Sequence, residues 1–168
     1  MFRTLIRPAL LSAMFLLVAL SALAQSTAVA PPQTAYGLPI ALENAKKAAV
    51  AAVAEARKNN WNMAVAIVDT AGYLVYFERM DNTQFGSVQL AIEKARTSAL
   101  FRRPSKFFQD GLAAGGEGLR FLGLTGAIPV EGGFPILAEG KIVGAVGVSG
   151  GAGAQDSQVA KAGADSIK

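Results

Sequence analysis

The central feature of the chain is a pair of apolar runs separated by a tight turn, in the stretch EGGFPILAEGKIVGAVGVSGG from Glu131 to Gly151. Glu139 and Gly140 lie between the runs at hairpin spacing, and Gly140 supplies the positive φ that such turns need. Apolar residues occupy both the odd and the even positions of the second run, which is typical of a strand covered on both faces. Gly144 and Gly147 in this run indicate that another backbone approaches closely. We therefore predict a central hairpin whose second strand is covered by helices of this chain or by a neighbouring subunit.

The rest of the chain alternates between helical and extended patterns. Apolar residues recur every three or four positions in the segments predicted as helices and alternate in those predicted as strands. The predicted helices span residues 40–59, 89–101, 104–112 and 154–167, and the predicted strands 62–69, 73–79 and 127–131 precede the hairpin. Residues 113–118 form a glycine-rich loop, and 119–124 are compatible with either helix or strand. This order predicts a single α+β domain, with a mainly antiparallel five-stranded sheet packed with helices.

The N-terminal residues have the pattern of an export signal. Arg3 and Arg7 precede an apolar segment over residues 9–23, and Ala22-Leu23-Ala24 is typical of a cleavage site. The segment is shorter than the roughly 18 residues of a membrane-spanning helix, which favours a signal peptide over residues 1–24 rather than an uncleaved anchor. Residues 25–39 then form a flexible lead-in, and 40–168 the folded domain. We expect a periplasmic or secreted protein that is free of the membrane after cleavage.

Composition restricts the chemistry that the chain can perform. The 168 residues include no histidine and no cysteine. This excludes Ser-His and Cys-His catalysis, zinc bound by histidine or thiolate, iron–sulfur clusters, disulfides, and a histidine or cysteine ligand for haem. The formal net charge is +4, of which Arg3 and Arg7 carry two, and the other basic residues are scattered among acids. A nucleic-acid partner is therefore not indicated.

Three glycine clusters raise the question of a phosphate site: Gly115-Gly116, Gly132-Gly133 and residues 147–153. None is followed by the Gly-Lys-Ser/Thr of a Walker loop, and none has the spacing of a dinucleotide fingerprint. We interpret them as turns and points of close packing. Residues 150–153 are the exception to test, because they open a helix whose free N–H groups can bind an anion.

Five short motifs resemble one known family. They are Arg79-Met80-Asp81, then EKART at 93–97, EGGFP at 131–135, GAVGVSG at 144–150 and AQD at 154–156. In this order they resemble the GlcG/HbpS-like family, also known as the haem-degrading-domain group and related to the C-terminal domain of PduO-type proteins. The likeness covers roughly residues 41–168. It implies a profilin-like fold, haem or a related tetrapyrrole as ligand, and homo-oligomers as large as octamers, and it connects GlcG-type relatives with glycolate use.

The same motifs supply the candidate binding residues. The loop after Arg79, the helical turn at 93–97 and the loop at 131–135 are positions from which a scaffold presents side chains. Together they combine charged groups with apolar walls, as a carboxylate-bearing ligand requires. We predict that they converge on a ligand site, with a subunit interface, an internal ion pair or a solvated helix face as the alternatives. The candidates are Arg79, Met80, Asp81, Glu93, Lys94, Arg96, Thr97, Phe101, Glu131, Gly132, Gly133 and Phe134.

The resemblance implies that haem is bound, but the sequence contains few side chains that could coordinate the haem iron. The weak candidates are Thr97, Met80, Tyr73 and Tyr76. We therefore expect any bound haem to be held largely by apolar contacts and by arginine–propionate pairs. The neighbouring residues Arg102 and Arg103 are a basic pair that could attract the propionates. No other metal site is predicted.

Three functions remain open at this point. The first is an exported oligomeric protein that binds haem or a related tetrapyrrole for sequestration, sensing or slow degradation. The second is an enzyme or binding protein for a small anionic metabolite such as a 2-hydroxy acid, using Arg79, Lys94 and Arg96 against its carboxylate. The third is a structural or regulatory oligomer without a ligand. The missing histidine counts against the first, and the lack of a recognisable acid–base or metal set counts against the second.

Overall fold

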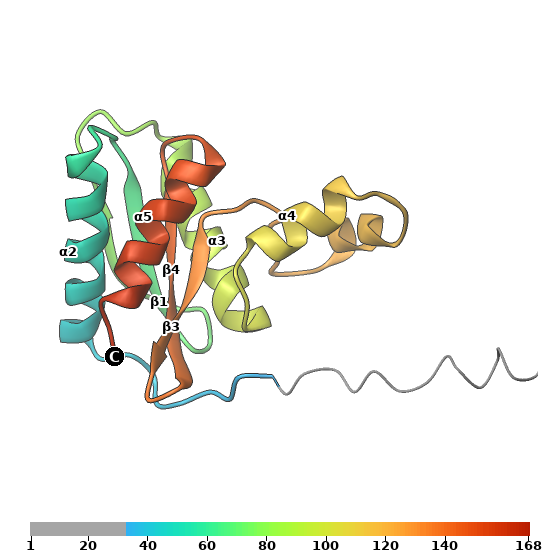
Figure 1. Ribbon diagram of the computed structural model, residues 1–168, viewed down its shortest axis with the longest axis horizontal. Coiled ribbons are helices and arrows are strands. Elements are labelled where there is room, and N and C mark those ends of the chain that lie inside the picture. The colour runs from blue at the N-terminus through green and yellow to red at the C-terminus, as the bar shows by residue number, and fades with distance from the viewer. Residues whose placement is uncertain (1–32) are drawn as a thin grey trace, which may run out of the picture. The chain divides into compact units, whose positions relative to one another are not determined.

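The computed structural model describes residues 33–168, which form an α+β domain around one four-stranded antiparallel sheet (Figure 1). The strands lie in the order β2-β1-β4-β3. The α+β class is thus confirmed. The elements are α2 Leu42–Lys58, β1 Ala64–Asp69, β2 Leu74–Arg79, α3 Gly86–Phe101, α4 Lys106–Ala113, the 3₁₀ helix η1 Gly116–Gly123, β3 Gly133–Ala138, β4 Lys141–Ser149 and α5 Gly153–Asp165.

The predicted central hairpin is present as β3 and β4. Glu139 and Gly140 have φ values of 50° and 71°, so both turn residues adopt the left-handed conformation that matches the twist of the flanking strands. β4 pairs with β3 on one side and with β1 on the other, from Ala64 opposite Ser149 to Asp69 opposite Gly144. β4 is therefore an inner strand of the sheet, as its two apolar faces indicate.

Helices of the same chain cover both faces of this sheet (Figure 1). Helices α2 and α5 pack on one face, and α3 packs on the other. The α3 face is built from small residues: the alanines of α3 meet Ala64, Ala66 and Ala145. Gly147 allows the closest approach, because a Cβ there would lie 2.0 Å from the carbonyl oxygen of Ala91. The cover that the sequence required for β4 thus comes from its own helices.

The prediction of a fifth strand over residues 127–131 is wrong. Backbone groups that a strand would pair with a neighbouring strand are bound to side chains instead. The N–H of Ile128 donates to Thr97 Oγ1 at 2.8 Å, and the N–H of Glu131 donates to Gln109 Oε1 at 2.9 Å. Pro129 between them has no N–H to donate to a neighbouring strand. The segment therefore runs as an irregular connection into β3.

The segment before α2 is attached to the sheet. Ile142 N donates to Ala35 O, Gly37 N donates to Ile142 O, and Ile40 N donates to Val143 O. This part of the predicted lead-in extends the sheet beyond the end of β1. The predicted signal peptide and residues 25–32 lie outside the described residues. Within residues 33–168, no helix has the length and apolar character to cross a membrane.

Helix α4 and η1 form an arm, residues 106–123, that projects from the domain in Figure 1. The two helices pack on each other, with Phe107 and Phe108 of α4 against Phe121 of η1. Residues 119–124, which the sequence left open between helix and strand, belong to this 3₁₀ helix up to Gly123.

Replacement of Gly147 by alanine should destabilise the domain, because the added methyl group collides with the backbone of α3. We expect a loss of about 1–3 kcal/mol in the free energy of unfolding, measured by urea titration. Gly86→Ala is the matched control: no atom lies within 4 Å of a Cβ built there, so its effect should be near zero or slightly stabilising. Equal stability of both variants would contradict the close packing of α3 on β4.

Candidate functional site

Lys94 is a fully buried charged residue among the candidates, and its ammonium group is hydrogen-bonded on two sides. Its side chain is 1% exposed, and Nζ donates to Asp156 Oδ2 at 2.7 Å and to Val148 O at 3.0 Å. Asp156 Oδ1 in turn accepts from the N–H of Gly151 at 2.9 Å. The pair thus joins α3 to β4 and to the start of α5. In this arrangement Lys94 is a structural residue.

Burial raises the pKa of the Asp156 carboxyl above its usual value, and the Lys94 ammonium and the N–H groups of Gly151 and Gly150 oppose this rise. Gly132 and Gly133 lie directly against the pair. A Cβ on Gly132 would be 2.9 Å from Lys94 Nζ, and a Cβ on Gly133 would be 2.2 Å from the Lys94 carbonyl oxygen. The glycines of the EGGFP motif therefore make room for a buried ion pair.

Three further candidates lie on the same helix or in the loop before β3: Thr97 and Phe101 follow Lys94 on α3, and Glu131 precedes Gly132. The Thr97 hydroxyl is buried, donates to Glu93 O at 2.8 Å and accepts from Ile128 N at 2.8 Å. The Phe101 ring packs edge-on against Phe108 with centroids 5.1 Å apart. Glu131 accepts from the Ser157 hydroxyl at 3.4 Å. The structure thus brings the 93–97 turn together with the 131–134 loop.

The third predicted segment lies elsewhere. Arg79, Met80 and Asp81 line a polar pocket of about 320 Å³ at the β2 edge of the sheet. Three strand spacings, roughly 14 Å at about 4.8 Å each, separate β2 from β3. Arg96 is also apart, because its side chain lies beside Gly72 in the turn at the other end of β2. No single pocket of the described residues therefore joins Arg79, Lys94 and Arg96.

The four weak haem-ligand candidates are scattered in the same way. Tyr73 is 71% exposed in the β1–β2 turn, and the Tyr76 hydroxyl donates to Glu78 on the same strand. Met80 is in the pocket at the β2 edge, and Thr97 is a buried residue of α3. These side chains do not face one common cavity. Within residues 33–168, no group of three histidine, cysteine, aspartate or glutamate side chains could hold a metal ion.

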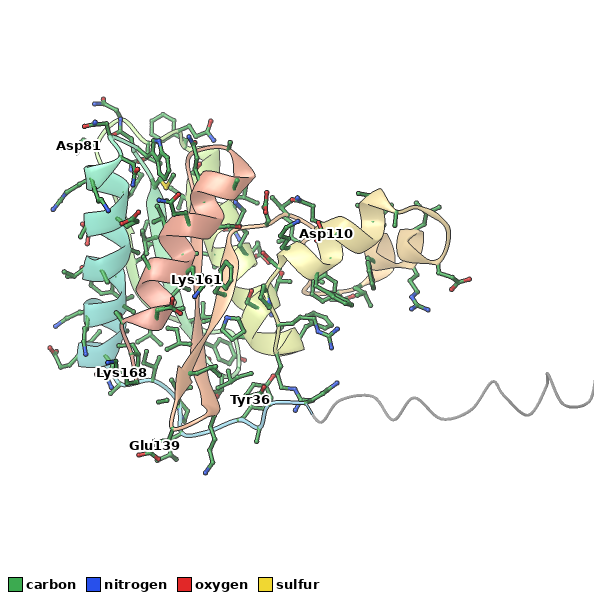
Figure 2. The ribbon with its side chains drawn as sticks, in the orientation of Figure 1. Tyr36, Asp81, Asp110, Glu139, Lys161 and Lys168 are labelled. Carbon is green, nitrogen blue, oxygen red and sulfur yellow. The ribbon has the colours of Figure 1, made fainter. Side chains whose placement is uncertain are left out.

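A groove that the motif analysis did not identify runs along β3. We call this cavity of about 320 Å³ the β3 groove. Its lining includes the apolar residues Phe134, Pro135 and Leu137. Its charged residues are Arg102 and Arg103, together with Lys161, which is paired with Asp165. Only Phe134 was among the candidate site residues, and the Arg102-Arg103 pair is the sequence signal that points here. Arg102 stacks on Tyr36, with its guanidinium carbon 5.2 Å from the ring centroid. Tyr36 and Asp81, a residue of the β2-edge pocket, lie at opposite ends of the domain (Figure 2).

The two arginines of the groove are held in place by neighbouring groups. Arg102 lies over Tyr36 and also donates to Gln33 Oε1. The Arg103 guanidinium carbon lies 4.4 Å from the centroid of the Phe107 ring, and its Nε donates to Phe101 O at 3.1 Å. Each guanidinium group has five N–H donors, and the hydrogen bonds described here use only some of them. The remaining donors can bind an anionic ligand. The groove combines an apolar lining with preorganised positive charge.

Comparison with known proteins identifies the chain's relatives. The model of the family "Haem degrading protein HbpS-like" matches residues 40–165. The chain belongs to this HbpS-like family. The resemblance read from the motifs is thereby confirmed.

Individual relatives agree with this assignment. Protein GlcG of Escherichia coli strain K12 is 40% identical over 95 residues, which are 56% of this chain and 69% of GlcG. A doubly substituted variant of HbpS from Streptomyces reticuli is 31% identical, with a TM-score of 0.72 over 85% of this chain and 98% of HbpS. The haem complex of PduOC, at 24% identity, supports the fold alone, with a TM-score of 0.70 over 78% of this chain and 96% of PduOC.

Replacement of Lys94 by methionine should be strongly destabilising, because Asp156 would remain buried without its partner. We expect a loss of about 3–5 kcal/mol in the free energy of unfolding. The double variant Lys94→Met/Asp156→Leu should recover much of this loss, because no uncompensated charge remains. Lys106→Met breaks the exposed Lys106–Asp110 pair and should cost at most about 1 kcal/mol. Chemical denaturation measures all three, and a mild effect of Lys94→Met alone would contradict the structural role of the pair.

Proposed function

We propose that the chain binds haem or a related tetrapyrrole in the β3 groove. The observation that carries this proposal is the apolar lining of the groove together with its two fixed arginines. Membership of the HbpS-like family and the likeness to HbpS support haem as the ligand class. A PduOC structure in complex with haem has the same fold.

The residues of the groove suit the two parts of a tetrapyrrole. Phe134, Pro135 and Leu137 offer a surface for one face of the ring, and Arg102 and Arg103 offer charged hydrogen bonds to the propionates. At about 320 Å³ the groove is at the lower end of the roughly 300–1000 Å³ range of ligand pockets. It would therefore cover part of the ring and leave the rest exposed.

The groove residues would hold the ligand without bonding its metal. Thr97, Met80, Tyr73 and Tyr76 do not line the groove. A bound haem would supply redox-active iron, while this chain's residues would bind and orient the ring by contact and charge. Sequestration or sensing follows most directly from such a site. The 2-hydroxy-acid alternative gains no support, because Arg79, Lys94 and Arg96 lie apart.

A titration with haem tests this site against the one predicted from the motifs. Arg103→Gln should weaken binding by about 1.5–3 kcal/mol, because it removes a charged hydrogen bond to a propionate. Arg79→Ala, in the pocket at the β2 edge, is the control and should bind as the unsubstituted chain does. The change in the Soret absorbance measures both. If Arg79→Ala weakens binding and Arg103→Gln does not, the ligand lies at the β2 edge.

Iron-free protoporphyrin separates the two modes of binding. A groove without an iron ligand should bind protoporphyrin and haem within a few-fold of each other, as tryptophan quenching of Trp61 can report for both. A much tighter complex with haem would mean that a side chain ligates the iron and that the groove is not the site.

We also propose that residues 1–24 direct export to the periplasm or the medium and are removed there. The support is the sequence pattern of two arginines, an apolar segment and Ala22-Leu23-Ala24. Mass spectrometry of the protein from fractionated bacterial cells should find Gln25 as the first residue. Recovery of the chain with Met1 from the cytoplasmic or membrane fraction would contradict it.

A further inference from the structure

The arm exposes apolar side chains that its own chain does not cover. Leu122 is 68% exposed, Leu119 is 56% exposed and Phe107 is 48% exposed. The two helices of the arm are closed on each other by glycine contacts: a Cβ on Gly118 would lie 1.8 Å from Gly111 O. Neither α4 nor η1 makes extensive contact with the sheet or with another helix of the described chain. The exposed leucines are therefore on a compact projection that packs on little else.

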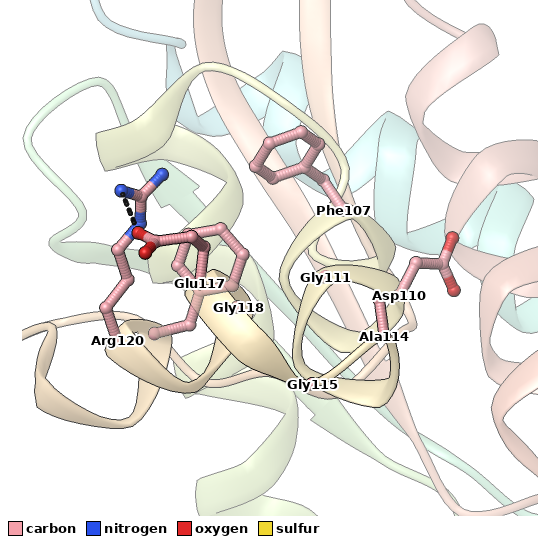
Figure 3. A pocket seen from close by; sticks show the side chains of 9 residues that line it. Phe107, Asp110, Gly111, Ala114, Gly115, Glu117, Gly118 and Arg120 are labelled. Atoms are coloured by element: carbon pink, nitrogen blue, oxygen red, sulfur yellow. Dashed lines mark hydrogen bonds and ion pairs between the residues drawn. The ribbon is translucent and has the colours of Figure 1, made fainter. Parts of the chain in front are cut away.

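The same arm contains a hollow of about 430 Å³ (Figure 3). Phe107 and Phe121 form its walls, and Gly111, Gly115 and Gly118 leave its base without side chains. Its lining is mainly apolar, and an aliphatic side chain is the size of group that such a hollow accepts. Leu122 does not line it. The arm thus presents a protruding apolar side chain and an apolar hollow side by side.

The charges of the arm favour a second arm as the partner. The arm carries two cations, Lys106 and Arg120, and two anions, Asp110 and Glu117, so its net charge is zero. Arg120 and Glu117, 70% and 93% exposed, form one ion pair at the rim of the hollow, as the dashed line in Figure 3 marks. The second ion pair joins Lys106 to Asp110, so each cation has its anion within its own arm and two arms can meet without repulsion. An arm that bound a lipid surface would instead carry an excess of Lys and Arg.

We propose that the arm is the contact surface for a second copy of this chain. In this arrangement the arms pair about a two-fold axis, and Leu122 of each copy enters the hollow between Phe107 and Phe121 of the other. Such an isologous contact uses the same patch on both copies. The proposal does not rest on the proposed ligand site, and it places the contact outside β4, whose faces are covered by the chain's own helices.

The mass of the ligand-free protein in solution tests this contact. The unsubstituted chain should form dimers or larger even-numbered assemblies in light scattering at micromolar concentration. In the proposed dimer, Leu122→Glu places a charge in the hollow of the other copy, and Ala114→Trp fills the hollow of its own copy. Each should weaken association at least about tenfold. Val50→Glu alters a similarly exposed apolar residue on α2 and should leave the mass unchanged. Circular dichroism melting verifies that all variants are folded.

Cross-linking locates the contact directly, because the chain has no cysteine of its own. A mixture of the single variants Leu122→Cys and Ala114→Cys should form a mixed disulfide dimer on mild oxidation, whereas Val50→Cys with Ala114→Cys should not. A monomeric unsubstituted chain overturns the proposal. So does a folded Leu122→Glu variant that keeps the unsubstituted mass, or a mixed disulfide that forms equally well with Val50→Cys.

Discussion

The buried ion pair between Lys94 and Asp156 is the constraint on which the rest of the domain depends. A charge this deep is tolerated only when its partner and its remaining hydrogen bonds are in place, and here Nζ has both the carboxylate and the Val148 carbonyl. The bonds fix α3 relative to β4 and α5 at one point. They also require a loop without side chains above them, which Gly132 and Gly133 provide. The EGGFP motif and the EKART motif are therefore two halves of one packing arrangement.

Side-chain and backbone hydrogen bonds from Ser105 cover part of the β3 edge of the sheet. Both backbone polar groups of Gly133 are hydrogen-bonded to Ser105. Gly133 N donates to Ser105 Oγ at 2.9 Å, and Ser105 N donates to Gly133 O at 3.1 Å. Pro135, two residues on, has no N–H to offer. The β3 edge is thus poorly suited to pairing with another strand, as natural sheet edges often are. The contact proposed for the arm uses exposed apolar side chains instead, such as Leu119 and Leu122.

The sequence predicted what depends on local pattern and missed what depends on distant partners. Periodicity and turn residues located the helices and the hairpin, because an apolar face and a positive φ are visible within a few residues. The false strand at 127–131 has a suitable apolar pattern, but Thr97 and Gln109 occupy its N–H groups, and both are more than 20 residues away. Lys94 reads as a ligand-binding charge until Asp156, which is 62 residues later, is seen beside it. The β3 groove likewise joins Arg102 and Phe134, which no spacing rule connects.

The groove and the arm share one contact, so the two proposals are physically linked. The Arg103 guanidinium rests on the Phe107 ring, and that ring is also a wall of the hollow in the arm. An arm that pairs with another copy holds Phe107 in place and thereby holds Arg103, a charged group of the groove. A ligand that binds Arg103 meets a side chain whose rotamer freedom is already reduced, which lowers the entropic cost of binding. If both proposals hold, coupling must be reciprocal, so the ligand strengthens pairing of the arms by the same factor by which pairing strengthens ligand binding.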